Sequence, residues 1–311
     1  MAGNSKEKPV TIYGAMAANL LIAITKFTAA FFTGSSSMLS EGIHSLADTG
    51  NEGLLLLGVH RSDKKPDATH PFGYGQELYF WSLVVAIVLF GLGGGMSLYE
   101  GITHILNPHA LEDPLWNYVT LALAVLFEGT SFIIALRALL RAKGHESIWQ
   151  AVHTSKDPAI FVVLFEDAAA LIGLALAFLG VFLSHRLGEP RLDGVASILI
   201  GLVLAAVSMA LAYESKGLLL GESADPATVR QIQQLVTADR DVQRARKPLT
   251  MHLGPQEVLV NLDVEFRPGL SSSELTATVD RLEQKIRGAA PQVTRIFIEA
   301  EALAQAERGN A

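Results

Sequence analysis

The sequence of 311 residues contains no cysteine. Disulfide bonds and thiolate metal sites are therefore excluded, and any metal ion would have to be held by His, Asp, Glu or Asn. Charged residues are also scarce, at 18% of the chain against about 25% in a typical soluble protein. The net charge of −7 and the lack of a basic cluster argue against a nucleic-acid partner. No nucleophile–base pair, phosphate loop or cofactor fingerprint is present, so we predict neither an enzyme nor a prosthetic group.

Hydrophobic residues, in contrast, make up 50% of the chain, and the mean hydropathy is +0.34. They form long blocks over the first two-thirds of the sequence, whereas residues from about Lys216 onward have the composition of a soluble domain. This division predicts a membrane domain, residues 1–215, followed by a soluble domain, residues 216–311.

Six apolar blocks reach the length of about 20 residues that a helix needs to cross the hydrocarbon core of a bilayer. They lie at about residues 11–33, 38–59, 78–101, 115–138, 159–184 and 195–214. The first block is longer than the apolar core of a signal peptide, so we interpret it as a retained span, although small residues near Thr28–Ala30 could imitate a cleavage site. The connection from Thr33 to Ser37 is very short and predicts a tight helical hairpin.

Lys and Arg are distributed unevenly between the connections, and this asymmetry predicts the orientation in the membrane. With the N-terminus in the cytosol, the outer loops contain only Arg186 and Arg191. The inner segments then contain Lys6, Lys8, Arg61, Lys64, Lys65, Arg137, Arg141, Lys143, Lys156 and Lys216. We therefore predict a multi-pass protein of the inner (plasma) membrane with both termini in the cytosol.

Small residues recur at a spacing of four in two of the spans. They are Gly91 and Gly95 in the third span, and Ser197, Gly201 and Ala205 in the sixth. Such stripes let helix backbones approach closely, so we predict a packing seam at each. The glycines of 91–95 could alternatively permit a hinge.

The second span carries charged side chains that are costly to insert into a bilayer and are therefore functional candidates. Glu41, His44, Asp48 and Glu52 follow one another at spacings of three, four and four, which places them on one helical face. His44 and Asp48, one turn apart, can bind a single ion through an imidazole nitrogen and a carboxylate oxygen. In the alternative interpretation, the pair only bonds neighbouring helices.

The fifth span contains two adjacent acids, Glu166 and Asp167, in otherwise unbroken apolar sequence. A cation is the obvious compensating partner for them. Because adjacent side chains diverge by about 100° on a helix, we expect one to bind a metal ion while the other takes a proton or a polar neighbour.

Three further polar residues lie in or beside the spans. Glu128, in the fourth span, is interpreted as an interhelical hydrogen-bond acceptor, with a proton site or an extra metal ligand as the alternative. Lys26, in the first span, is expected to pair with one of the acids or to extend towards the membrane surface. Asp193 precedes the sixth span and is interpreted as the N-cap of that helix.

The sequence resembles the cation diffusion facilitator (CDF) family of metal/proton antiporters over nearly its whole length. The resemblance rests on GSSSMLSEGIHSLADTGNEGLLLLG, HPFGYGQELYFWSL, EGITHILNP and the segment Asp193–Ile198. It implies a transport site where the second and fifth spans meet, built from a (His/Asp)-x-x-x-Asp motif on each.

The resemblance carries over to the site residues only in part. His44 and Asp48 match the motif of the second span, and Asp167 matches its last position in the fifth. Val163 stands at the first ligand position there, so Glu166 is the candidate for the fourth ligand, as in a family branch with Glu-Asp in this helix. A second metal site known from some members, in the loop before the third span, would use His70, but Tyr74 stands where its second histidine is needed.

The residues after Asp225 show the pattern of a soluble αββαβ domain. Residues 257–266 alternate between apolar and polar, and Ser271 with Glu274 forms a capping box that opens a helix. The expected order is a helix over 226–238, strands at 248–253 and 257–266, a helix over 271–286 and a strand at 293–298. This order is typical of a ferredoxin-like sandwich with both helices on one face of the sheet. The resemblance implies that the domain dimerises, and its only histidine, His252, is interpreted as a surface residue rather than a metal ligand.

Together these features predict a divalent transition-metal efflux transporter that exchanges metal for protons across the lipid bilayer. Metal binding requires neutral imidazole and ionised carboxylates, so protonation of the site expels the metal. One nitrogen with carboxylate oxygens suits Zn²⁺, our first candidate, and also Mn²⁺, Fe²⁺ or Co²⁺. The alternatives are a monovalent cation/proton antiporter and a membrane scaffold that transports nothing.

Overall fold

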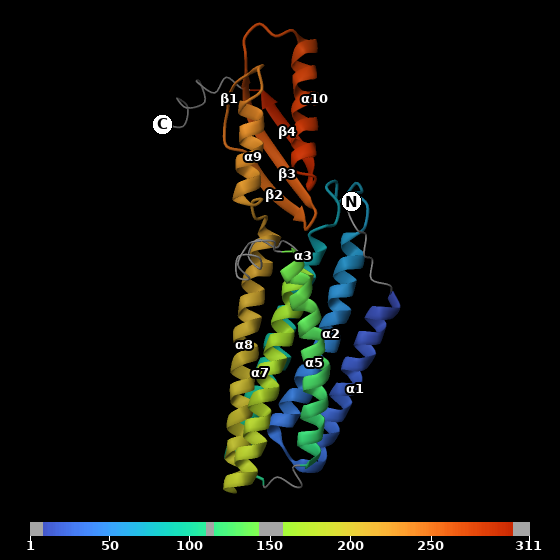
Figure 1. Ribbon diagram of the computed structural model, residues 1–311, viewed down its shortest axis with the longest axis vertical. Coiled ribbons are helices and arrows are strands. Elements are labelled where there is room, and N and C mark those ends of the chain that lie inside the picture. Colours follow the sequence, from blue (N-terminus) through green and yellow to red (C-terminus); the bar gives the residue numbers. More distant parts are fainter. Residues whose placement is uncertain (1–8, 110–114, 143–157, 301–311) are drawn as a thin grey trace. The chain divides into compact units, whose positions relative to one another are not determined.

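Residues 9–109, 115–142 and 158–300 are described by the structure, which is a computed structural model (Figure 1). The chain divides into two units, one of Met1–His60 with Phe80–Lys216 and one of Arg61–Tyr79 with Gly217–Ala311. Lys6, Lys8, Lys143 and Lys156, on which the predicted orientation partly depends, lie outside the described residues. The orientation therefore stays a prediction.

The first unit consists of long helices that run alongside one another (Figure 1). They are α1 (Pro9–Thr33), α2 (Ser36–Ser62), α3 (Glu77–Val88), η1 (Leu89–Gly95), α4 (Met96–Leu106), α5 (Leu115–Ala142), α7 (Pro158–Leu187) and α8 (Arg191–Leu220). Each predicted span falls inside these helices, with α3, η1 and α4 together covering the third. Gly34, with φ of 69°, makes the predicted short turn between α1 and α2.

Four helical segments of the described chain are long and apolar enough to cross a membrane: Glu77–Leu106, Leu115–Arg137, Phe161–Leu187 and Arg191–Leu220. The chain is thus a multi-pass helical membrane protein. In α1 the apolar segment Asn19–Thr33 is shorter than these four. The acids of α2 lower its hydropathy, so the full set of six spans stays a prediction.

The third span is interrupted by a π-helical turn, and this moves its packing seam. A side chain added at Gly91 would meet nothing within 4 Å, so the predicted seam of Gly91 and Gly95 is wrong. Residues four apart no longer share a face where the helix is π-helical. Gly94 and Gly101 pack instead against α8, where Gly201 lies as predicted.

The closest approach of α4 and α8 predicts a strong effect of Gly101→Ala. A methyl group at Gly101 would lie 2.7 Å from the carbonyl oxygen of Gly194 and 2.8 Å from the nitrogen of Ile198. Overpacking of this kind costs about 1–3 kcal/mol. We expect a lower thermal unfolding midpoint in detergent, with Gly91→Ala as the matched control. Equal midpoints for both variants would contradict the close contact.

The second unit contains a four-stranded sheet with two helices, in the order α9 (Pro226–Thr237), β1 (Val242–Ala245), β2 (Leu249–Gly254), β3 (Glu257–Phe266), α10 (Ser272–Ala289) and β4 (Val293–Ala300). β1 and β2 both pair antiparallel with β3, at its end and its beginning respectively, and β4 pairs with β3 in parallel. β1 was not predicted, because its four residues, VQRA, are too short and too polar to show an alternating pattern. The ferredoxin-like arrangement stays a prediction.

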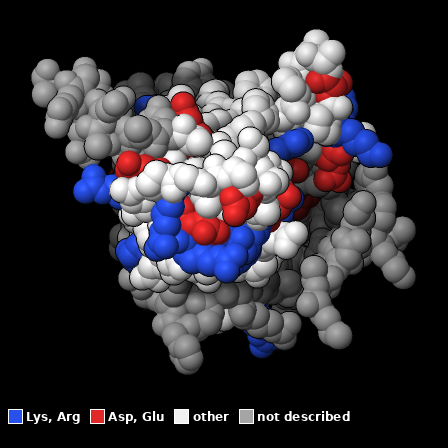
Figure 2. All heavy atoms as spheres, turned by 90° about the horizontal axis from the view of Figure 1, so that it is seen from above, with Lys and Arg blue, Asp and Glu red and all other residues white. Residues whose placement is uncertain are grey.

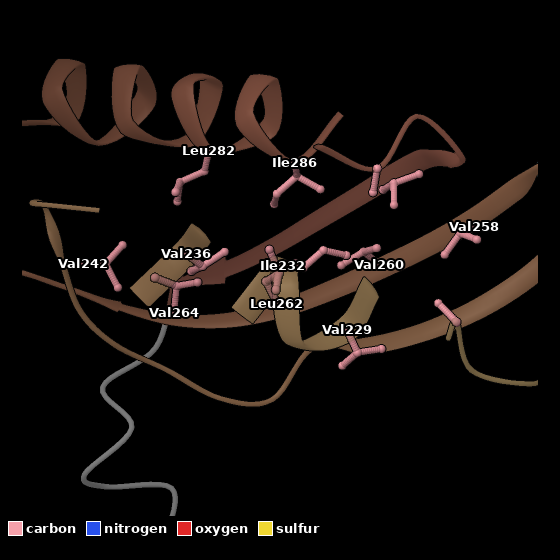
Figure 3. Close-up of a cluster of buried hydrophobic side chains, with 13 residues drawn as sticks. Val229, Ile232, Val236, Val242, Val258, Val260, Leu262, Val264, Leu282 and Ile286 are labelled. Atoms are coloured by element: carbon pink, nitrogen blue, oxygen red, sulfur yellow. The ribbon is translucent and has the colours of Figure 1, made fainter. Parts of the chain in front are cut away.

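The core of this unit lies between the sheet and the two helices (Figure 3). The predicted inward-facing residues of β3 from Val258 to Val264 are buried, and Leu282 of α10 and Ile232 of α9 pack against the same face. Both helices therefore cover one face of the sheet, as predicted. His252 is buried, so its interpretation as a surface residue is wrong. Its backbone nitrogen donates to the oxygen of Glu222, which covers this edge of β2.

The connection between α2 and α3 belongs to the second unit and has its own hydrogen bonds. Asp67 accepts a bond from the Tyr74 hydroxyl at 2.7 Å, and this bond is the main reason that the pKa of Asp67 lies well below its usual value. The ring of His70 lies 4.2 Å from the ring of Tyr74. The Phe72 ring lies 6.4 Å from Phe297 of β4. This ring contact joins the segment to β4 within the second unit, whereas Asp63 to Asp67 remain exposed.

Acidic and basic side chains lie beside one another on the face shown in Figure 2. Within the second unit, Arg281 of α10 donates to Asp239 at 2.7 Å and to Asp241 at 2.8 Å, and Lys285 donates to Asp239 at 2.8 Å. The bond from Arg281 is the largest of the causes that hold the pKa of Asp239 far below its usual value.

Replacement of Arg281 by alanine should lower the local stability of α10, and the size of this effect should depend on pH. The pKa of Asp239 is lowered in the folded state, so the bond between Asp239 and Arg281 stabilises the fold at pH values above the usual pKa of 3.8. This stabilisation is lost as the pH falls below that value. At pH 7 we expect a loss of about 2 kcal/mol, measured as amide hydrogen exchange of α10 corrected for the intrinsic rate. The difference from wild type should shrink below pH 3.8. Arg287→Ala, which removes a pair with Glu283 on the same helix, is the control.

Candidate metal centre

α2 and α7 meet in the interior of the helical unit. The Asn51 side-chain nitrogen of α2 donates to Oε1 of Glu166 on α7 at 2.7 Å, and both side chains are buried. The predicted site requires α2 and α7 to be neighbours, and this hydrogen bond shows that they are.

A small cavity of about 50 Å³ lies between these helices, α1 and α5. It is lined by Asn19, Ile22, Ser45, Asp48, Glu52, Phe127, Glu128, Ser131, Val163, Glu166 and Asp167. Three of the four predicted ligands, Asp48, Glu166 and Asp167, thus share one cavity. His44 does not line it but lies behind Asp48, with Nδ1 3.4 Å from Oδ1 of that residue.

Each acid of α7 has a polar neighbour. Glu166 accepts the bond from Asn51, and Asp167 accepts a bond from the Ser131 hydroxyl of α5 at 2.8 Å. Both side chains reach the cavity although they leave the helix in different directions. The expectation that one of them binds a metal ion while the other takes a proton or a polar neighbour stays a prediction.

The donor atoms suit a divalent transition metal in type, and several of them lack partners. Both ring nitrogens of His44, Oδ1 of Asp48 and Oε2 of Glu52 are buried without a hydrogen bond. An imidazole nitrogen with carboxylate oxygens is a donor set that Zn²⁺ accepts. Within the described residues, however, no three His, Asp or Glu side chains are close enough to hold one ion, so binding requires the side chains to converge.

Lys26 and Glu128 pair with each other beside this cavity. Lys26 is fully buried and donates to Glu128 at 2.9 Å and to Glu41 at 3.0 Å. The predicted pairing of Lys26 with an acid is confirmed, as is the interhelical hydrogen bond of Glu128. The alternative in which Lys26 extends to the membrane surface is wrong, because the pair satisfies its charge in the interior.

Asp193 caps a helix other than its own. It lies in the first turn of α8, and its carboxylate accepts bonds from the backbone nitrogens of Ser36 and Ser37 and from the hydroxyls of Ser35 and Ser37. The prediction that it caps α8 is wrong. The side chain instead satisfies the free amide groups at the start of α2, the helix that carries His44 and Asp48.

Sequence reasoning missed three uncharged members of the site. Asn51 and Ser131 bind the two acids of α7, and Ser45 accepts from Lys26 at 2.7 Å. The available signal was their position: Asn51 lies one helical turn from Asp48, and Ser131 one turn from Glu128.

Comparison with known proteins agrees with this architecture. A family profile described as the cation efflux transmembrane domain matches residues 12–220. The mitochondrial proton-coupled zinc antiporter SLC30A9 of Mus musculus is 37% identical over 255 residues, which are 81% of this chain and 45% of that protein. The chain therefore spans about half the length of this relative.

Two further relatives match across a larger share of their own length. The metal tolerance protein C4 of Arabidopsis thaliana is 26% identical over 265 residues, covering 85% of this chain and 58% of the relative. The cation-efflux pump FieF of Pectobacterium atrosepticum is 25% identical over 276 residues, covering 88% and 86%. Because the profile covers most of the chain, including every helix that lines the cavity, the protein belongs to the cation efflux family.

Proposed function

We propose that this protein exports a divalent transition-metal ion, Zn²⁺ first among the candidates, in exchange for protons. The observation that carries the proposal is the cavity that Asp48, Glu166 and Asp167 share inside a membrane-spanning helical unit. Acidic side chains in such a place are costly unless a cation or protons neutralise them. The relatives named as a zinc antiporter, a metal tolerance protein and a cation-efflux pump support this chemistry.

In the proposed mechanism, His44, Asp48, Asp167 and Glu166 converge on one metal ion when the cavity opens to the cytosol. The ion binds neutral imidazole and ionised carboxylates, so its arrival displaces protons. Opening to the more acidic outer side returns protons to the same groups and releases the metal. Asn51 and Ser131 orient the carboxylates of Glu166 and Asp167, because each donates a hydrogen bond to one of them.

The remaining features of the proposal concern assembly and placement. We propose six membrane spans in a transport domain, residues 1–215, and a cytosolic ferredoxin-like domain, residues 216–311, through which two copies dimerise. Both termini are placed in the cytosol and the protein in the inner (plasma) membrane. The name of the SLC30A9 relative gives a mitochondrial location for that protein, and mitochondrial targeting of this chain in cells would overturn our placement.

Transport by purified protein in liposomes tests the proposal. With a zinc-sensitive dye inside and a pH dye in the same vesicles, an outward proton gradient should drive Zn²⁺ entry, and protons should leave as zinc enters. Zinc entry that ignores the pH gradient would contradict antiport. Movement of Na⁺ or K⁺ without any zinc flux would favour a monovalent cation antiporter, and no metal-dependent stabilisation in detergent would favour a scaffold.

Glu166→Gln tests the proposed ligand that lies outside the motif of the family. Glutamine keeps the length of the side chain and an oxygen for the Asn51 hydrogen bond but lacks the negative charge. If the Glu166 carboxylate binds the metal, the zinc affinity of purified protein should fall at least about tenfold. Glu222→Gln, in the connection after α8, is the control. An affinity equal to wild type would remove Glu166 from the ligand set.

A further inference from the structure

The ammonium group of Lys26 is a buried positive charge that has no role in the proposed transport mechanism. Its side chain is fully buried in the helical unit. Nζ lies 3.0 Å from Oε2 of Glu41, 2.7 Å from Oγ of Ser45 and 2.9 Å from Oε1 of Glu128. A lysine ammonium has three N–H donors, so these three acceptors, from α2 and α5, use all of them.

This ammonium touches the wall of the metal cavity. Ser45 and Glu128 both line the cavity that also holds Asp48, Glu166 and Asp167. Glu128 differs from these three acids because a cation already occupies its Oε1. In the part of the chain that the structure describes, Asp48, Glu166 and Asp167 have no Lys or Arg partner within 4.0 Å.

A purely structural role explains this arrangement poorly. A buried ammonium with two carboxylates brings little net stability, since well-packed apolar side chains of similar volume are often as stable. The position of Lys26 beside Glu128 decides instead how many carboxylates can bind an ion in the cavity. When Lys26 is present, its ammonium occupies the Glu128 carboxylate. Without Lys26, the Glu128 carboxylate could bind the ion as an additional oxygen ligand.

We propose that Lys26 is a specificity-determining residue that withholds Glu128 from the transported ion. This inference rests on the proposed function. With Glu128 withheld, the ligands of the ion are the imidazole of His44 and the carboxylates of Asp48, Asp167 and Glu166. This mixed nitrogen and oxygen set favours Zn²⁺. An additional carboxylate would shift the preference towards harder ions such as Mn²⁺, which bind oxygen ligands well.

The experiment measures equilibrium binding of Zn²⁺ alone and Mn²⁺ alone to purified full-length variants. Glu128→Gln should leave both affinities within about twofold of wild type, because Glu128 is not a ligand. Lys26→Met should raise Mn²⁺ affinity relative to Zn²⁺ by about tenfold, since the freed carboxylate joins the site. The double variant, Lys26→Met with Glu128→Gln, should return the ratio to the wild-type value.

Each outcome decides between the alternatives. A tenfold loss of zinc affinity in Glu128→Gln would overturn the proposal, because it would make Glu128 a ligand, and this arm needs no change at Lys26. An unchanged metal ratio in a folded Lys26→Met variant would also overturn it. Failure of the wild-type protein to bind either metal would contradict the proposed function itself, a result distinct from the other two.

Discussion

Asp48→Ala is expected to reduce zinc transport in liposomes to the background of empty vesicles and to weaken zinc binding by at least about 100-fold. Asp48 lines the cavity, lies next to His44, and has a buried carboxylate oxygen without a hydrogen-bond donor. An unpaired buried carboxylate is costly for folding, so its removal should leave the unfolding midpoint unchanged or raise it. Lost transport together with unchanged stability is the signature of a ligand.

The control for this prediction is Asp280→Ala, which removes an exposed acid from α10. It should transport zinc at the wild-type rate. Full zinc flux in Asp48→Ala would remove this residue from the site, and with it the matched motif in α2. Loss of flux accompanied by a lower unfolding midpoint would instead identify Asp48 as a residue needed for folding.

Asp193→Ala should be among the most destabilising single substitutions in the helical unit. It removes the acceptor for two backbone amides at the start of α2 and for the hydroxyls of Ser35 and Ser37. Loss of a cap costs about 1 kcal/mol and each buried unsatisfied donor about 1–3 kcal/mol, so we expect a total on the order of 3 kcal/mol. The measurement is the thermal unfolding midpoint of the purified protein in detergent.

Two comparisons interpret that result. Glu189→Ala removes an exposed acid near the start of α8 and should leave the midpoint unchanged. Asp193→Asn keeps one acceptor oxygen and should lie between wild type and the alanine variant. If the alanine variant were as stable as wild type, the carboxylate would not cap α2 in the folded protein.

The helices and the acids of the site could be predicted because both produce strong local signals. Apolar blocks of sufficient length mark the spans, and charges such as Asp48 and Asp167 stand out against an apolar background. Asn51 and Ser131 were missed because uncharged polar residues cost much less in a membrane and are not conspicuous there. The hydrogen bonds that they make depend on which helices become neighbours, and no local sequence pattern predicts those contacts.

Other errors have the same origin in long-range or irregular structure. The partners of Asp193 lie more than 150 residues away in the sequence, so a local helix cap was the natural expectation for an Asp before a helix. The seam of the third span was misplaced because a π-helical turn changes which glycines share a face. β1 escaped prediction because it is defined only by its pairing with β3.

The contact of Asp193 with the first turn of α2 holds that end of a long helix. With a rise of about 1.5 Å per residue, Asp48 lies about 18 Å along the helix from this contact. A tilt of about 5° there would therefore displace Asp48 by roughly 1.6 Å, whereas metal–ligand distances tolerate only about 0.2 Å. A tilt of α2 that leaves its hydrogen bonds to Asp193 intact would therefore be large enough to bring Asp48 into, or take it out of, bonding distance of a metal ion.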